Sequence, residues 1–138
     1  MTNAPSDIAR VVIEKARDGR VRVSVARTNY RIDLVDASGG SAANATVGRP
    51  LEGRIRAKAL KMHRAAAGGT FIEPIEGTPR IVQGRVLATD TVNNTAIVHA
   101  VVPMRIDVPP GQCASDFATG DLVNFYVESG ATFALSGV

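Results

Sequence analysis

Basic and apolar side chains alternate one by one in Arg54-Ile55-Arg56-Ala57-Lys58-Ala59. Successive side chains of a β-strand point to opposite faces, so this pattern predicts a strand with an apolar inner face and a basic outer face. The parity reverses in Leu60-Lys61-Met62-His63, which predicts an extra residue, a β-bulge. Because a bulge curves a strand, we expect this long strand to serve both sides of a small barrel.

The same alternation recurs upstream, in Arg20-Val21-Arg22-Val23-Ser24-Val25 and in Tyr30-Arg31-Ile32-Asp33-Leu34. Asp18-Gly19 is a dipeptide suited to a tight hairpin turn, and it precedes the first of these runs. Residues 9–36 therefore predict an N-terminal β-meander. Residues 7–17 also fit a helical period with Ser6 or Asp7 as the cap, and strand is the preferred interpretation.

Further strand-like runs follow at 70–73, 80–89, 96–102, 104–108, 122–127 and 132–135. Pro103 is expected to break the apolar run 96–102, residues 115–118 to form one helical turn, and 132–135 to form a last edge strand. Gly84 lies inside a strand, which indicates a bend or a close backbone approach. The predicted fold is all-β, one domain over 1–138, with a meander at 9–36, a flexible loop of small residues at 37–48 and a main barrel at 49–138.

The composition limits the core and the partners. The chain has 138 residues, a formal net charge of +3 and only 4% aromatic residues, so the core must consist mainly of Val, Ile, Ala and Leu. Net charge is +3 over residues 1–50, +3 over 51–90 and −3 over 91–138. Such asymmetry predicts separate basic and acidic surfaces, suited to an anionic partner or to head-to-tail homo-oligomer formation.

Cysteine usage and hydropathy bear on the compartment. Cys113 is the single cysteine, so an intrachain disulfide is excluded and a reducing cytoplasm is the expected location. The first residues lack the basic start and apolar stretch of a secretory signal. No apolar run approaches the roughly 18 residues of a membrane span, so we expect no membrane association.

Catalytic and metal-binding patterns are missing from the sequence. The candidates for nucleophilic or acid–base chemistry are His63, His99 and Cys113, and no spacing brings them together. His99 alternates with apolar residues, so we expect a partly buried, hydrogen-bonded imidazole. The histidines, the cysteine and the scattered carboxylates match no zinc or calcium pattern. The sequence predicts a non-enzymatic protein with no cofactor and no metal.

The basic row is the strongest candidate binding feature. Three cations project from one side of the predicted strand about 7 Å apart, and two more residues continue the row after the bulge. Such an array neutralises phosphates, and Phe71 or Tyr126 could add a stacking face. The alternative is a charged outer face that only confers solubility. The predicted ligand-binding residues are Arg54, Arg56, Lys58, Lys61, His63, Arg80, Arg85 and Phe71.

The layout from Pro50 onward resembles the five-stranded OB-type (oligonucleotide/oligosaccharide-binding) barrel, including its cold-shock members. It has a long bent strand, an exposed loop, a hairpin, a loop with a helical turn and the closing strand Gly120-Asp121-Leu122-Val123-Asn124-Phe125-Tyr126-Val127. The resemblance implies a small barrel over residues 50–138. The aromatic motifs with which cold-shock proteins bind RNA are missing, so none of their binding residues carries over.

A shorter motif is similar to PilZ domains, which bind cyclic dinucleotides through an Arg-x-x-x-Arg pair and a later Asp-x-Ser-x-x-Gly. Arg27 and Arg31 have the required spacing, and Asp36-Ala37-Ser38-Gly39-Gly40-Ser41 follows. Serine occupies the final glycine position, and the two parts lie closer together than in that family. The resemblance implies phosphate clamping by two guanidinium groups.

The sequence therefore predicts a binding or assembly module that uses its basic strand face to contact nucleic acid or another anionic partner. The alternatives are a self-associating structural protein without a small-molecule ligand and a PilZ-like cyclic dinucleotide receptor.

Overall fold

The computed structural model describes residues 6–39 and 47–136. Within these residues the chain forms an eleven-stranded sheet and a short 3-10 helix at Ala114–Asp116, and the prediction of an all-β fold is confirmed. The strands are β1 (Ile8–Arg17), β2 (Arg20–Ser24), β3 (Arg31–Asp36), β4 (Pro50–Arg64), β5 (Phe71–Glu73), β6 (Glu76–Gly77), β7 (Ile81–Asp90), β8 (Thr95–Ala100), β9 (Val102–Asp107), β10 (Leu122–Val127) and β11 (Thr132–Leu135).

The first three strands form the predicted meander. β1 pairs antiparallel with β2 and β2 with β3, so residues 8–17 are a strand and not a helix. Asp18 and Gly19 both have positive φ, 55° and 74°, as a tight hairpin turn requires. The β1–β2 register shifts between Ile13 and Lys15, which leaves Glu14 as a bulge residue.

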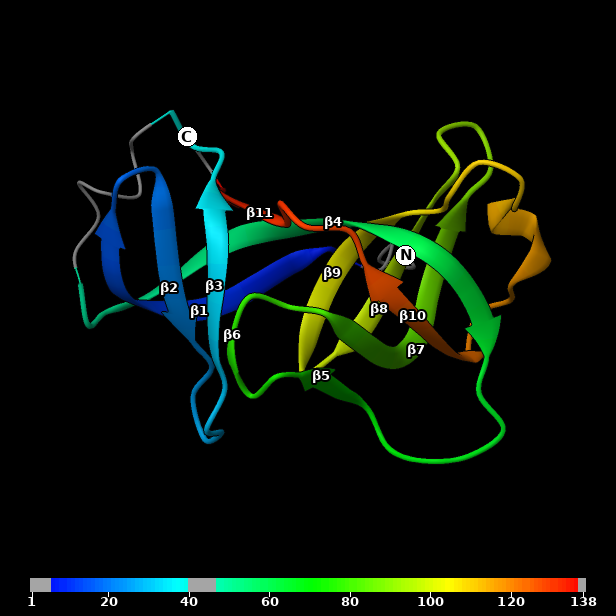
Figure 1. Ribbon diagram of the computed structural model, residues 1–138, viewed down its shortest axis with the longest axis horizontal. Helices are drawn as coiled ribbons and strands as arrows, with labels where there is room; N and C mark the ends of the chain where they lie inside the picture. Colours follow the sequence, from blue (N-terminus) through cyan, green and yellow to red (C-terminus); the bar gives the residue numbers. More distant parts are fainter. Residues whose placement is uncertain (1–5, 40–46, 137–138) are drawn as a thin grey trace, which may run out of the picture.

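The long strand β4 runs through the whole molecule, as Figure 1 shows. Its first part pairs with β1 and β11, its middle pairs in parallel with β9, and its last part pairs with β10. Two rings of paired strands therefore share β4. We call β1-β2-β3-β11-β4 the β1 ring and β7-β8-β9-β4-β10 the β7 ring.

The two rings have the same pattern of pairings. Each contains a three-stranded meander, β1-β2-β3 or β7-β8-β9. The last meander strand pairs in parallel with the next strand of the ring, β3 with β11 and β9 with β4. All other pairings within the rings are antiparallel.

A single hydrophobic core fills both rings. Buried side chains of β1, β2 and β3 belong to the same cluster as those of β7, β8 and β9. Aliphatic residues dominate it, as the composition predicts, and Phe133 and Phe125 are its largest fully buried side chains. Gly84 permits close packing, because a Cβ there would lie 2.5 Å from the backbone oxygen of His99. Gly53 is equally confined, with the backbone oxygen of Ala134 2.7 Å from such a Cβ.

The arm from β5 to β6 joins the two rings. β5 pairs with β7, whereas β6 pairs in parallel with β3. The Arg31 backbone amide donates to the carbonyl of Ile75 at 2.9 Å, and the Ile72 amide donates to the Tyr30 hydroxyl at 3.3 Å. This arm therefore ties the outer side of the β1 ring to the β7 ring.

Two details of the predicted organisation are wrong. The apolar run ends at Val101, which has φ 67°, and Pro103 lies inside β9, opposite His99. Residues 132–135 form no edge, because β11 lies between β3 and β4. The meander pairs directly with segment 49–138, since β1 pairs with β4 and β3 with β11. Residues 40–46 of the predicted loop at 37–48 lie outside the described residues, and its remaining residues contain no strand.

Candidate functional site

The outer face of β4 carries the predicted basic row. Ile55, Ala57 and Ala59 are buried while the cationic residues between them are exposed. The predicted bulge is present, since Met62 lies opposite Phe125 and Ala59 opposite Val127, which places two β4 residues opposite Tyr126. The exposed outer residues of the row are Arg54, Arg56, Lys58, Leu60, Lys61, His63 and Arg64.

A glutamine side chain completes the backbone hydrogen bonding at the bulge. The Met62 amide donates to Oε1 of Gln112 at 2.8 Å, and Nε2 of Gln112 donates to the Met62 carbonyl at 2.7 Å. The side chain thus takes the place of a neighbouring strand where β9 has ended. The Gln112 side chain thus holds the bulge of β4, after which Lys61 and His63 point outward.

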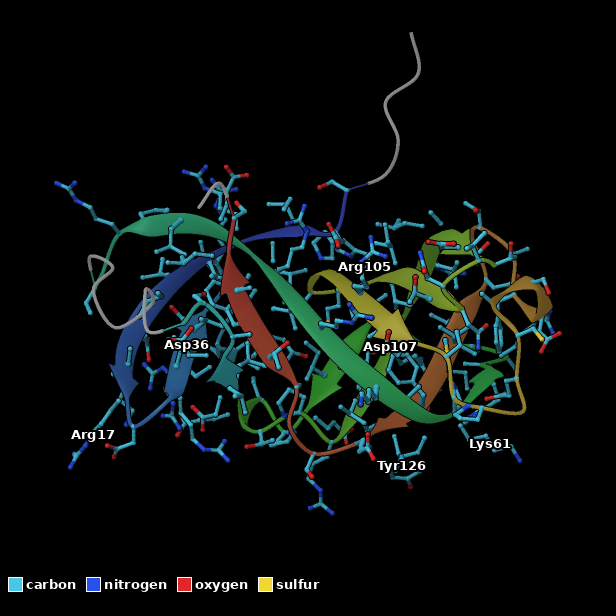
Figure 2. The ribbon with its side chains drawn as sticks, turned by 90° about the horizontal axis from the view of Figure 1, so that it is seen from above. Arg17, Asp36, Lys61, Arg105, Asp107 and Tyr126 are labelled. Carbon is cyan, nitrogen blue, oxygen red and sulfur yellow. The ribbon has the colours of Figure 1, made fainter. Side chains whose placement is uncertain are left out.

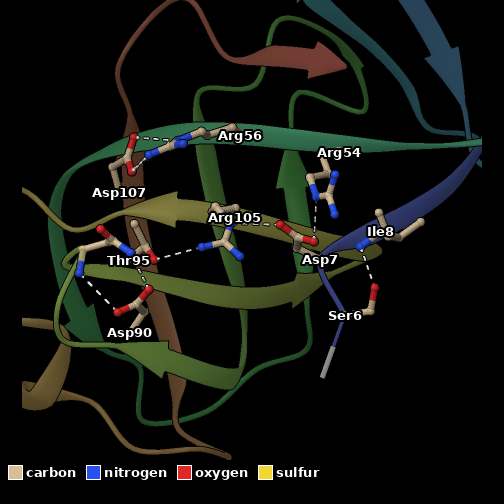
Figure 3. A network of polar contacts seen from close by, with 10 residues as sticks. Ser6, Asp7, Ile8, Arg54, Arg56, Asp90, Thr95, Arg105 and Asp107 are labelled. Atoms are coloured by element: carbon tan, nitrogen blue, oxygen red, sulfur yellow. Dashed lines mark hydrogen bonds and ion pairs between the residues drawn. The ribbon is translucent and has the colours of Figure 1, made fainter. Parts of the chain in front are cut away.

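The first cation of the row belongs to a polar network at the junction of the rings. Asp7 lies between two arginines, with its oxygens 3.0 Å from Nε of Arg54 and 2.8 Å from Nε of Arg105 (Figure 3). Nη1 of Arg105 also donates to the Thr95 hydroxyl at 3.2 Å. This network connects the residue before β1 to β4, β8 and β9.

The carboxylate of Asp7 is stabilised in its charged form. Burial raises the pKa of Asp7, but the hydrogen bonds and positive charges of Arg105 and Arg54 outweigh burial and lower the pKa below the ordinary 3.8. Only 6% of Asp7 is exposed. The ion pairs of Asp7 with Arg54 and Arg105 are therefore partly desolvated contacts that link strands.

The second cation of the row is also paired. Arg56 donates two hydrogen bonds to Asp107, at 3.2 and 2.7 Å, in the bidentate arrangement that Figure 3 shows. Hydrogen bonding to Asp107 raises the pKa of Arg56. Arg54 and Arg56 thus already hold carboxylates of this chain.

The later part of the row lies in a different environment. Lys58, Lys61 and His63 are exposed and form no ion pair with any residue that the structure describes. Leu60 and Lys61 lie opposite Tyr126, and 60% of Tyr126 is exposed. Figure 2 shows Lys61 and Tyr126 along one side of the molecule.

We call this outer surface of β4, β10, β7 and β5 the Tyr126 face. Cross-strand partners put His63 beside Asn124, Asn124 beside Gln83 and Gln83 beside Phe71. The Asn124 amide donates to Gln83 at 3.0 Å, and Gln83 donates to the Gly69 carbonyl at 2.9 Å. The Tyr126 face consists of Lys61, His63, Phe71, Arg80, Ile81, Gln83, Asn124 and Tyr126.

A hollow of about 480 Å³ opens on this face. Tyr126 and Ile81 line it together with Arg80, Glu73 and Pro74. Arg80 is exposed and reaches the hollow from the position just before β7, the strand next to β10. Phe71 is half-buried two residues before Glu73 on β5, so it supplies a second aromatic ring at the edge of the face.

Arg85 lies farther along β7 and lines a separate hollow. Its Nη1 donates to the Gly120 carbonyl at 3.1 Å. This hollow, of about 380 Å³, also contains Arg64, which is paired with Asp121 at 3.0 Å and lies over the Phe117 ring. The structure thus gathers four of the eight predicted residues on the Tyr126 face, namely Lys61, His63, Phe71 and Arg80. It places Arg85 at a separate hollow.

The other candidates for catalysis, His99 and Cys113, lie on separate elements of the described chain. His99 is exposed, in contrast to the expected partial burial, because its side chain points outward beside Arg85. Cys113 is exposed in the turn before the 3-10 helix. Among residues 6–39 and 47–136 no three His, Cys, Asp or Glu side chains gather as metal ligands, and no helix is long and apolar enough to span a membrane.

The two parts of the PilZ-like motif lie at opposite ends of β3. Arg27 is in the turn before this strand, and Arg31, its first residue, is 3.5 Å from both Glu14 and Glu76. Asp36 ends the strand, and Ser38 accepts a hydrogen bond from Leu135. Gly40 and Ser41 lie outside the described residues.

Comparisons with known proteins assign the chain to no family. No family model matches it, and no curated protein or solved structure matches it.

Sequence reasoning missed the acidic partners of the row. Asp7 is 47 residues from Arg54 and 98 from Arg105, and Asp107 is 51 residues from Arg56. No local pattern joins residues so far apart. The antiparallel pairing of β1 with β4 puts Ile8 opposite Arg54 and so brings Asp7 to this arginine. The parallel register of β4 with β9 brings Arg105 and Asp107 beside β4.

Proposed function

We propose that this protein is a non-enzymatic binding module that holds single-stranded nucleic acid, an anionic partner, on the Tyr126 face. The observation that carries the proposal is the exposed Tyr126 ring, flanked by Lys61 on β4 and by Arg80 beside β7. Proteins that bind single strands combine cations that follow the backbone with aromatic rings on which bases stack.

Arg54 and Arg56, the first cations of the basic row, are paired with carboxylates, unlike Lys61 and His63 in the described chain. This difference favours the Tyr126 face, rather than the entire outer face of β4, as the binding surface. A phosphate at Arg54 or Arg56 would compete with Asp7 or Asp107 for the same donors. Lys61 and His63 have no such competitor within the described chain. Counterion release on phosphate binding would therefore come from the later residues.

The fold family we propose is the OB-type barrel. Support comes from the long bent strand β4, the β7–β8 hairpin, the helical turn at Ala114–Asp116 and the closing strand β10, which follow one another in the order that the resemblance implies. We place the function in the cytoplasm, because a lone exposed Cys113 suits a reducing compartment.

The test is fluorescence anisotropy with a labelled oligothymidine of about 12 nucleotides, starting at about 50 mM salt and rising to about 200 mM. We expect binding that weakens steeply with salt. Tyr126→Ala should cost about 1 to 3 kcal/mol of binding free energy through lost stacking. The double variant Lys61→Glu, Arg80→Glu should reduce binding further, since both charges reverse.

The matched control is Arg10→Glu, a charge reversal at an exposed residue of β1 outside the Tyr126 face. This variant should bind like the wild type. Absence of binding at about 50 mM salt, or an equal loss in Arg10→Glu, would refute the proposal. Light scattering on the same samples tests the alternative of self-association, which predicts a mass that grows with concentration while the oligonucleotide stays free.

A further inference from the structure

Four cations crowd the outer face of the β1–β2 hairpin. The register places Lys15 directly opposite Arg22 and Arg17 directly opposite Arg20. Like charges directly opposite each other destabilise an antiparallel pair. Two such pairs in succession are therefore a feature that stability alone does not favour.

Carboxylates pair with two of these four cations and leave the other two unpaired within the described residues. Arg22 donates two hydrogen bonds to Asp33, at 2.7 and 2.9 Å, and Arg17 is 3.3 Å from Asp18. Arg22 is also 3.5 Å from Glu76, a carboxylate that Arg31 shares. Lys15 and Arg20 form no ion pair with any acidic residue that the structure describes. The lining of one hollow contains these four cations and only two carboxylates, so the lining has an excess of two positive charges, and Glu76 lies outside it.

The cations converge on this hollow of about 330 Å³, a volume at the lower end of small-ligand pockets. Lys15 and Arg20 both contribute to the lowered pKa of Asp33, after the dominant hydrogen bond from Arg22, so their fields overlap at one point. Thr78, from the arm that carries β6, also lines the hollow and brings a hydroxyl group. The arm therefore forms a wall that a bare hairpin would lack.

We propose that this hollow binds the dianionic phosphate group of a small phosphorylated ligand. A phosphate carries about −1.5 to −2 charges at pH 7, which matches the excess of two. Arg20 offers a planar guanidinium group for bidentate contact, and Lys15 offers a point charge. This site lies on the β1 ring and does not rest on the function proposed for the Tyr126 face.

The experiment uses the full chain and two probes, inorganic phosphate and phenyl phosphate, at an ionic strength held constant with sodium chloride. Backbone amide shifts in two-dimensional NMR report both the location and the affinity. We expect shifts confined to the β1–β2 hairpin and Thr78, and affinity that rises between about pH 5.5 and 7.5 as the phosphate loses its second proton. Tighter binding of phenyl phosphate would identify an organic monoester as the ligand class, and equal binding would identify free phosphate.

The variants Lys15→Gln and Arg20→Gln should each weaken phosphate binding by about tenfold, the equivalent of one charge-assisted hydrogen bond. Both side chains are exposed, so the variants should keep the wild-type fold. Arg10→Gln, an exposed arginine at the other end of β1, is the control and should bind like the wild type. The proposal fails if phosphate causes no more shift than chloride, or if the double variant Lys15→Gln, Arg20→Gln binds phosphate unchanged.

Discussion

The β1 ring and the β7 ring close through the same pairings, yet their charged outer surfaces differ. Around the β7 ring, Arg56 is paired with Asp107 and Arg64 with Asp121. On the β1 ring, Arg22 is paired with Asp33, but the register also places Lys15 opposite Arg22 and Arg17 opposite Arg20. The aliphatic core and the backbone pairings thus fix the strand arrangement, while the outer charges are free either to lock strands together or to stay open for a ligand.

The largest expected effect concerns whether the rings are one folding unit. Phe133 fills the β1 ring and Phe125 the β7 ring, and both are fully buried in the common core. Phe133→Ala and Phe125→Ala should each lower the free energy of unfolding by about 3 to 5 kcal/mol. Urea denaturation of each variant should show one transition, and two separate transitions would contradict the single core.

The next effect concerns the close approach of β7 and β8. A methyl group at Gly84 would meet the backbone of His99, which cannot rotate away, so Gly84→Ala should cost about 1 to 3 kcal/mol. Gly69→Ala is the control, because no atom lies within 4 Å of a Cβ there. It should change the unfolding free energy by less than about 0.5 kcal/mol in the same denaturation experiment.

A smaller and pH-dependent effect is expected at the junction of the rings. Asp7→Asn removes the charge between Arg54 and Arg105, which should cost about 1 to 2 kcal/mol at pH 7, since both arginines are partly solvated. The folded pKa of Asp7 is lowered, so its contribution is complete above the ordinary pKa of 3.8 and is lost as the pH falls through the lower folded value.

The stability difference between wild type and Asp7→Asn should therefore be constant near neutral pH and shrink below about pH 4. Thermal unfolding at several pH values measures it. A difference that stays the same from pH 7 to about pH 2 would show that the carboxylate charge is not the source of the stabilisation.

The smallest effect is the change in the free energy of unfolding when one arginine charge is removed. This change should have opposite signs in the two rings. Arg56→Gln breaks an exposed bidentate pair and should destabilise the protein by about 0.5 to 1 kcal/mol. Arg20→Gln relieves the repulsion with Arg17 and should stabilise the ligand-free protein by about 0.2 to 0.5 kcal/mol in low salt. Both differences should shrink in high salt, and equal signs would contradict the contrast between the rings.

Much of the local structure follows from the sequence. Alternation locates the outward row on β4 and its bulge, and the Asp18-Gly19 turn locates the first hairpin. The close packing around Gly84 is also predictable, because a glycine inside a strand usually marks a bend or a close approach of another backbone. These features depend on neighbouring residues, so one segment contains the information.

Features that depend on distant residues are not predictable in this way. The insertion of β11 between β3 and β4 and the parallel pairing of β9 with β4 have no local signal. The acidic partner of Arg56 follows from the β4–β9 pairing and that of Arg54 from the pairing of β1 with β4, so neither partner is visible in the local sequence of the basic row. The positive φ of Val101 is another tertiary result, because a β-branched residue rarely adopts it.

The position of β11 constrains the order in which the protein can assemble on the ribosome. β3 and β4 are synthesised long before β11, yet they gain their common neighbour only when residues 132–135 have left the exit tunnel. Until then the aliphatic inner faces of the meander lack Phe133 and stay open to solvent or to chaperones. Completion of the first half of the molecule is thus delayed until nearly all of the second half has been translated.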